Sequence, residues 1–319
     1  MTKKILSIQN HIPKGASVEA QDFIRKAANA GDREVTLEQI AKIREETRIG
    51  FTPTVEAICQ ETAITYEDIE IAGIQVMTVT PHNYDATNEE RCILYFYGGG
   101  YVLGSPFEDL VVTAQLANLT GLKIYAPWYR LAPEHPYPAA LNDGIAVYEE
   151  LIKRMKPGGL TLSGESAGGN LALVVALRAK EIELPPPSAL ALLSPWSDLS
   201  DTSESNWTHL GLDPTFPSKP DDGSISRAYG GDADFYDPMI SPVYADYSGG
   251  FSPTLMTSGT RDMLMSDSAR LSTVMRQAGV NVQLNLWEGM WHVFEFYPEL
   301  PESKQSLEEI ANFIMAHTS

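Results

Sequence analysis

The stretch Leu160-Thr161-Leu162-Ser163-Gly164-Glu165-Ser166-Ala167-Gly168 decides the fold. Residues 160–164 predict a buried strand and residues 171–181 a helix, so the pattern Gly-x-Ser-x-Gly falls on a sharp turn between them. Such a turn holds the serine on a strained backbone above the sheet, and the glycines avoid clashes with neighbouring elements. The same pattern would also suit a glycine-rich turn that only packs a helix against a strand. The strand–turn–helix context favours Ser166 as a nucleophile.

Strands and helices alternate along most of the remaining chain. Strand-like runs occupy residues 69–80, 92–97, 122–129, 160–164, 189–193, 253–258 and 280–287. Helical patterns occupy residues 107–120, 138–155, 171–181, 266–278 and 304–316. This alternation predicts an α/β fold whose mostly parallel central sheet is covered by helices on both faces. Ligands then bind beyond the carboxyl ends of the strands, which is where we look for chemistry.

Two segments depart from this alternation. Residues 16–48 are helical in pattern, and no β-rich run is expected before residue 68. Residues 198–250 are irregular, rich in Asp, Ser, Gly and Pro, with weak helical signals. We expect both segments to be accessory to the sheet.

A serine nucleophile needs a base, and the base needs an orienting acid. His292 is the only one of the six histidines that lies just past a late strand. Asp262 follows the strand at 253–258 and stands between Ser166 and His292 in the chain, which is the Ser, Asp, His order of α/β-hydrolases. Asp267 is the second candidate, although it resembles a residue at a helix start, and Asp198 is a third.

Three glycines follow the apolar strand at 92–97. Glycines let backbone N–H groups approach a substrate carbonyl closely, and fixed donors of this kind stabilise a tetrahedral oxyanion. A flexible loop is the alternative interpretation. We expect the oxyanion donors to be the N–H groups of Gly99, Gly100 and Ala167.

Three motifs together resemble the bacterial esterases related to hormone-sensitive lipase. Residues 97–101 (YGGGY) are similar to the family's H-G-G-G-[FW], residues 129–140 to its Y-R-L-A-P-E stretch, and residues 164–172 to G-[DT]-S-A-G-G-N-L-A. The resemblance extends from about residue 92 to 294. It implies the α/β-hydrolase fold and a serine carboxylesterase acting on short acyl esters, without a metal or organic cofactor.

The resemblance also implies a helical cap over the site. We expect residues 1–55 to form an N-terminal cap segment, and residues 56–319 to form the catalytic domain with a cap insertion at about 198–240. Homodimers are common in the family. The chain departs from the family at Tyr97, where a histidine is usual, at Glu165 and at Val293.

The same scaffold admits other functions. A non-catalytic ligand receptor would lack the triad histidine, whereas Ser166, Asp262 and His292 are all present here. An amidase or a deacetylase of specialised substrates would use the same three residues. The triple glycine resembles loops associated with esters of bulky alcohols. Arg130 and Glu134 have no place in acyl transfer, and we expect them to form structural ion pairs.

Composition limits the possible partners. The chain carries 23 Lys and Arg against 42 Asp and Glu, a formal net charge of -19, which repels nucleic acid and anionic lipid. The acidity serves solubility in the simplest interpretation, and adaptation to salt is the alternative. Cys59 and Cys92 show no metal or disulfide spacing, and Cys92 is expected to be a buried small hydrophobe. We therefore expect a cytoplasmic enzyme with no stable membrane anchor and a small-molecule ester as its partner.

Overall fold

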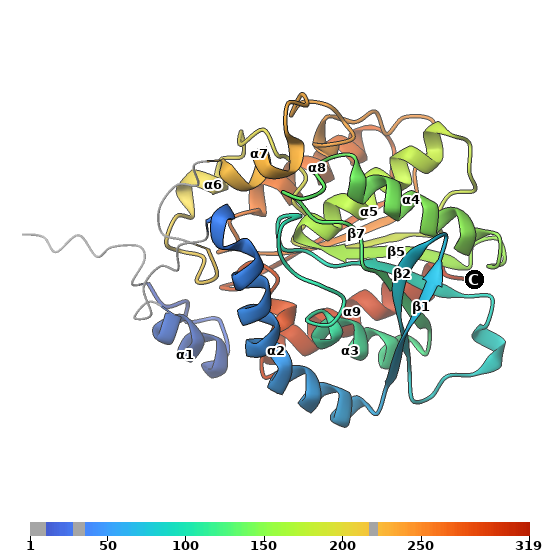
Figure 1. Cartoon of the computed structure of the whole chain (residues 1–319). Helices are drawn as coiled ribbons and strands as arrows, with labels where there is room; N and C mark the ends of the chain where they lie inside the picture. The colour runs from blue at the N-terminus through green and yellow to red at the C-terminus, as the bar shows by residue number, and fades with distance from the viewer. Residues whose placement is uncertain (1–10, 28–35, 217–222) are drawn as a thin grey trace, which may run out of the picture.

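The computed structural model describes residues 11–27, 36–216 and 223–319 (Figure 1). An eight-stranded sheet crosses the molecule in the order β1-β2-β4-β3-β5-β6-β7-β8. Its strands are β1 Thr65–Ile71, β2 Ile74–Thr80, β3 Cys92–Phe96, β4 Lys123–Pro127, β5 Leu160–Glu165, β6 Leu190–Leu193, β7 Thr254–Gly259 and β8 Val282–Trp287. The pairs from β4 across to β8 are parallel, whereas β2 runs antiparallel to both of its neighbours, β1 and β4. The mostly parallel α/β sheet is as predicted.

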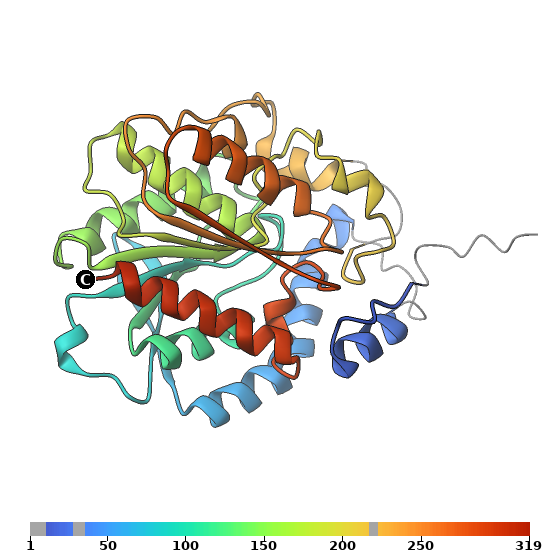
Figure 2. The ribbon, with the colours of Figure 1, turned by 180° about the vertical axis from the view of Figure 1, so that it is seen from behind.

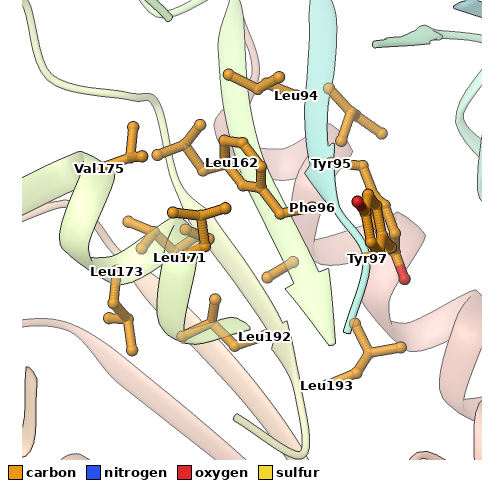
Figure 3. Close-up of a cluster of buried hydrophobic side chains, with 14 of the residues drawn as sticks. Leu94, Tyr95, Phe96, Tyr97, Leu162, Leu171, Leu173, Val175, Leu192 and Leu193 are labelled. Carbon is orange, nitrogen blue, oxygen red and sulfur yellow. The ribbon is translucent and has the colours of Figure 1, made fainter. Parts of the chain in front are cut away.

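The central strands are buried on both faces, as their continuous apolar runs predict. Every residue of β3, β5 and β6 is buried. Side chains from these strands and from the helix after β5 form one cluster, which includes Phe96, Leu162, Leu171 and Leu192 (Figure 3). Cys92 is buried within the same core, as expected. This packing supports the turn that carries Ser166.

Helices cover both faces of the sheet (Figures 1 and 2). One face carries α3 (Leu110–Thr120) and α9 (Pro301–His317), and the other carries α4 (Ala139–Ile152), α5 (Ser166–Glu181) and α8 (Met265–Gln277). The predicted helices are therefore present, with ends that differ by a few residues.

The N-terminal region is where the sequence interpretation is partly wrong. The helices there are α1 (Val18–Ala27), a 3₁₀ turn η2 (Leu37–Gln39) and α2 (Ile40–Thr62), while part of the predicted helical segment, residues 28–35, lies outside the described residues. Helix α2 continues 14 residues past residue 48 because it accommodates Gly50 and Pro53, which usually interrupt a helix. Strand β1 begins at Thr65, before residue 68. Only the start of β1 was not predicted, because it belongs to a mostly exposed, polar edge strand.

The irregular segment after β6 contains short helices, as its weak signals indicated. They are α6 (Ser205–Thr208), α7 (Ser224–Gly230) and a 3₁₀ turn, η4 (Pro242–Tyr244). In Figure 1, α6 and α7 lie at the end of the molecule where α2 begins. Ile225 on α7 lies close to the backbone of Gly100, so this segment reaches the loop after β3.

Candidate active site

Ser166 is the first residue of α5 and directly follows the end of β5. Its φ of 52° is in the left-handed region, which is a strained conformation for a residue with a side chain. The backbone at the end of β3 lies very close to this turn. A Cβ atom added at Gly168 would lie 2.0 Å from the carbonyl oxygen of Phe96. The glycine is therefore required by a close approach between the start of α5 and the end of β3.

Asp262 and His292 are brought together from the ends of β7 and β8. The Nδ1 atom of His292 lies 3.0 Å from Oδ1 of Asp262, whose side chain is fully buried. The N–H of Leu264 also donates to Oδ1 at 2.8 Å, and the Ser258 hydroxyl donates to Oδ2 at 2.8 Å. The carboxylate is thus held by three donors and can orient the imidazole.

The two alternative acids belong to another network. Asp267 is fully buried in the first turn of α8, where its carboxylate accepts from the Asp198 N–H at 2.8 Å and from the Ser203 hydroxyl. Asp198 forms an ion pair with Arg270. Neither carboxylate bonds to His292 among the described residues, so this geometry separates them from the base.

One short segment connects the serine turn to the histidine loop. The N–H of Trp196 donates to the carbonyl of Ser166 at 3.0 Å, and the N–H of Val293 donates to the Ser194 hydroxyl at 3.1 Å. In the part of the chain that the structure describes, no hydrogen bond joins Ser166 directly to His292. Ser194, at φ 45°, was not singled out by sequence, and only its place after β6 could have suggested it.

Buried carboxylates surround His292 and shift its pKa. Burial acts to lower the pKa of His292. The carboxylates of Asp262, Asp213 and Glu165, with Asp262 the largest among them, together outweigh burial and raise the pKa of His292 to about 9. Burial likewise acts to raise the pKa of Asp262, but its interactions with His292 hold it below the ordinary value. A base that is readily protonated suits the removal of a hydroxyl proton.

The glycine loop after β3 presents unpaired donors. Within the described residues, the N–H groups of Gly99, Gly100 and Ala167 donate to no protein acceptor. The neighbouring Gly98 N–H is paired instead, because it donates to the buried carboxylate of Glu165. Burial raises the pKa of Glu165 to about 7. The loop is therefore fixed at Gly98, and its next two N–H groups are left available.

Tyr97 occupies the family's histidine position and forms a reciprocal clamp with Tyr129. Its hydroxyl donates to the Tyr129 carbonyl at 3.1 Å, and the Tyr129 hydroxyl donates to the Tyr97 carbonyl at 2.7 Å. The two rings stack with centroids 4.2 Å apart. Two buried hydroxyls and one aromatic stack thus join the start of the glycine loop to the loop after β4.

The far end of the glycine loop is held by a second stack. Tyr101 packs against Tyr229 of α7 with ring centroids 3.6 Å apart, and its hydroxyl donates to Asn170 on α5 at 2.6 Å. The Asn170 amide donates in turn to the carbonyls of Trp196 and Ile240. One asparagine therefore links the glycine loop, the nucleophile helix and the segment after β6.

The two charged residues of the 129–140 stretch form separate ion pairs. Arg130 pairs with Asp143 at 2.7 Å, and Glu134 pairs with Arg44 of α2 at 2.9 Å. Arg44 also donates to the carbonyls of Val102 and Ala132, both at 2.7 Å. Because Val102 lies in the glycine loop, Arg44 attaches α2 to the site. The sequence contained no signal for this.

Residues 209–216, which follow α6, also contact the Asp262–His292 pair. Nδ1 of His209 lies 2.8 Å from the Asp262 carbonyl, and the ring of Phe216 lies 4.9 Å from the ring of His292. Asp213 accepts from the His292 N–H at 3.0 Å. Sequence reasoning missed all three residues, because they lie in an irregular segment with no motif.

Known proteins share this fold. A family model described as alpha/beta hydrolase fold matches residues 93–296. An esterase of Acinetobacter venetianus is 33% identical over 267 residues, which cover 82% of this chain and 86% of that protein. An acetyl-hydrolase of Streptomyces hygroscopicus is 32% identical over 235 residues, covering 73% of this chain and 78% of that one.

Solved structures give the same result. A hormone-sensitive lipase from a metagenome library superposes with a TM-score of 0.82 at 33% identity, covering 94% of this chain and 97% of its own. Esterase E25 superposes with a TM-score of 0.85 at 28% identity, covering 96% of each chain. The chain belongs to the α/β-hydrolase family, in the branch of the bacterial hormone-sensitive-lipase-like esterases. Within that family it is a carboxylic ester hydrolase.

Among the described residues, no helix combines the length and the apolar character that a membrane crossing requires.

Proposed function

We propose that the protein is a serine carboxylesterase that hydrolyses short acyl esters through Ser166, His292 and Asp262. The observation that carries the proposal is the hydrogen bond of 3.0 Å between His292 and the buried Asp262. That bond lies beyond the strand ends where Ser166 occupies its strained turn. The unpaired N–H groups of the glycine loop add the remaining requirement for acyl transfer.

The proposed reaction uses a covalent acyl-enzyme. His292 takes the proton of Ser166, whose oxygen attacks the ester carbonyl. The N–H groups of Gly99, Gly100 and Ala167 stabilise the oxyanion of the tetrahedral intermediate. His292 then gives its proton to the leaving alcohol, and water activated by the same imidazole releases the acid. Asp262 holds the ring and stabilises its charged form.

The proposed substrate class is short acyl esters. Phe216 lies against the imidazole ring, and Ile225 and Gly100 approach each other closely, so apolar side chains narrow the space beside the proposed oxyanion loop. The name of the Streptomyces relative, an acetyl-hydrolase, also favours a small acyl group. These features argue against long acyl chains.

We propose further that two segments cap this site. Residues 1–55 are the first and residues 198–240 the second, which contains α6, α7 and Phe216. Support comes from Arg44, which bonds to the glycine loop, and from the stack of Tyr229 on Tyr101. Helix α2 continues to Thr62, so the first segment joins the catalytic domain within a helix.

The test is hydrolysis of p-nitrophenyl esters from acetate to palmitate. Wild type should hydrolyse acetate and butyrate fastest, and Ser166→Ala should lose about 10⁴-fold or more in kcat while keeping its fold by circular dichroism. Ser248→Ala, in a loop away from the site, is the control and should match wild type. Hydrolysis by Ser166→Ala at the wild-type rate would refute the mechanism, and a preference for palmitate would refute the substrate class.

A further inference from the structure

One oxygen atom of Asp213 connects the loop of the proposed acid to the loop of the proposed base. Its Oδ2 atom accepts from the His292 N–H at 3.0 Å and from the Met263 N–H at 3.2 Å. Met263 directly follows Asp262. The separation between the two loops is therefore set by a single acceptor atom, in addition to the bond between their side chains.

The other oxygen of Asp213 holds its own segment. Oδ1 accepts from the Thr215 N–H at 2.9 Å and from the Thr215 hydroxyl at 2.6 Å. The next residue, Phe216, rests against the His292 ring. Both oxygens of one carboxylate are thus used, one by the segment between α6 and α7 and one by the two catalytic loops.

Asp213 is buried among charged groups. Only 2% of the residue is exposed, and burial together with the charge of Asp262 raises its pKa, while His292 opposes the rise. The charge of Asp213 also acts to raise the pKa of Arg261 and of Tyr297. The groups that face His292 are Asp262 from the loop after β7, Glu165 from the end of β5 and Asp213. A buried carboxylate destabilises the folded state unless hydrogen bonds satisfy its oxygen atoms.

We propose that Asp213 is a positioning residue that couples residues 209–216, which follow α6, to the alignment of Asp262 and His292. The inference rests on the proposed function of that pair. Because Oδ2 of Asp213 binds the N–H groups of both Met263 and His292, it fixes the position of one loop relative to the other. Without the Asp213 carboxylate, both loops lose a common anchor and the proposed base loses a nearby negative charge.

The experiment compares Asp213→Ala and Asp213→Asn with Asp234→Ala. Asp234 is a matched control, because its Oδ1 accepts from the N–H two residues later at 2.9 Å, as Asp213 does, but it is exposed and does not contact the site. The readouts are kcat, KM and the pH dependence of kcat/KM on p-nitrophenyl acetate, with thermal unfolding of every variant. Wild type and Ser166→Ala are measured beside them.

We expect Asp213→Ala to lower kcat by about 10–100-fold with little change in KM, because misplacement of a catalytic group acts on the chemical step. Asp213→Asn keeps one acceptor oxygen and should recover part of the loss. In both variants the acid limb of kcat/KM should move to lower pH, because a negative charge near His292 is gone. Asp234→Ala should match wild type in all three readouts.

Two results would overturn the inference: an Asp213→Ala enzyme with wild-type kcat and pH profile, or an equal loss in both variants with no shift of the acid limb. The second result would mean that Asp213 only supports the fold. If Ser166→Ala retained activity, the proposed mechanism itself would fail, and that failure is distinguishable from either result.

Discussion

Tyr97 stands where the family usually has a histidine, and the structure gives it a defined partner. Its bonds with Tyr129 run in both directions between hydroxyl and backbone carbonyl, and the rings stack over them. A histidine is smaller than tyrosine, so the clamp depends on the tyrosine side chain itself. The start of the glycine loop is therefore fixed here by an aromatic pair.

The Tyr97→Phe variant tests this clamp, because it keeps the ring and removes one hydroxyl. It should lower the free energy of unfolding by about 1–2 kcal/mol, since a buried carbonyl loses its donor. Tyr129→Phe removes the opposite bond and should have a similar effect. Urea unfolding followed by fluorescence measures both. An unchanged midpoint in both variants would contradict the clamp.

The pH dependence of kcat/KM tests the charge environment of His292. The imidazole must be neutral to accept a proton, and its pKa is raised to about 9 by its carboxylate neighbours. Activity should therefore rise with pH well above the ordinary histidine value of about 6.5. The measurement is initial hydrolysis rate from about pH 5 to 10, corrected for spontaneous hydrolysis. A plateau already complete at about pH 6 would contradict it.

At the scale of elements, the contact between α5 and β3 is the tightest constraint on the nucleophile turn. In Gly168→Ala the new Cβ would lie 2.0 Å from the Phe96 carbonyl oxygen and 2.4 Å from that of Tyr97, so backbone must move. We expect a loss of about 3 kcal/mol or more in stability together with lost activity.

Gly50→Ala is the matched control, since a Cβ there meets nothing within 4 Å and Gly50 lies inside α2. It should raise the free energy of unfolding by up to about 1 kcal/mol through helix propensity. If both alanine variants changed stability equally, the close-approach argument would be wrong.

Arg44 attaches helix α2 to the glycine loop of the candidate site. Arg44→Ala should lower kcat by about 10-fold, because the carbonyl of Val102 in the glycine loop loses its donor. Glu134→Ala removes only the partner in a half-exposed ion pair and should change stability by about 0–1 kcal/mol with kcat intact. Equal kcat in Arg44→Ala and wild type would show that α2 does not influence the loop.

At the scale of the whole molecule, stability and activity should depend on pH in opposite directions. Buried Glu165 and Asp267 have pKa values raised to about 7, so the folded state binds more protons than the unfolded chain. Their contribution is full below about pH 4 and is lost as pH rises through 7. The raised pKa of His292 acts in the same direction up to about 9, and the net charge of -19 adds repulsion.

At more acidic pH, stability should instead decrease as pH falls. Asp262 and Asp198 have lowered pKa values, and their contribution to the free energy of unfolding is lost as pH falls through those values. The free energy of unfolding should therefore be highest at mildly acidic pH, about 5–6, and fall toward about pH 9. Chemical unfolding at several pH values measures this. A maximum near about pH 9 would contradict the assignment of the buried acids.

The sequence by itself determined the sheet, its covering helices and the positions of Ser166, Asp262 and His292 as candidates. It could do so because strand and helix periods are local, and because residues that follow parallel strands meet at one edge. It misjudged the length of α2 and the start of β1, where Gly50, Pro53 and a polar edge strand hide the local pattern.

Only the tertiary structure decided which carboxylate bonds to His292, how the glycine loop is anchored, and that Arg44 and Asp213 reach the candidate site. Asp262, Asp267 and Asp198 are the same residue type in similar sequence contexts after a strand, and their three-dimensional partners distinguish them. Asp213 and His292 are 79 residues apart. Contacts between residues so far apart in the sequence leave no periodic pattern in it, because they depend on how complete elements pack.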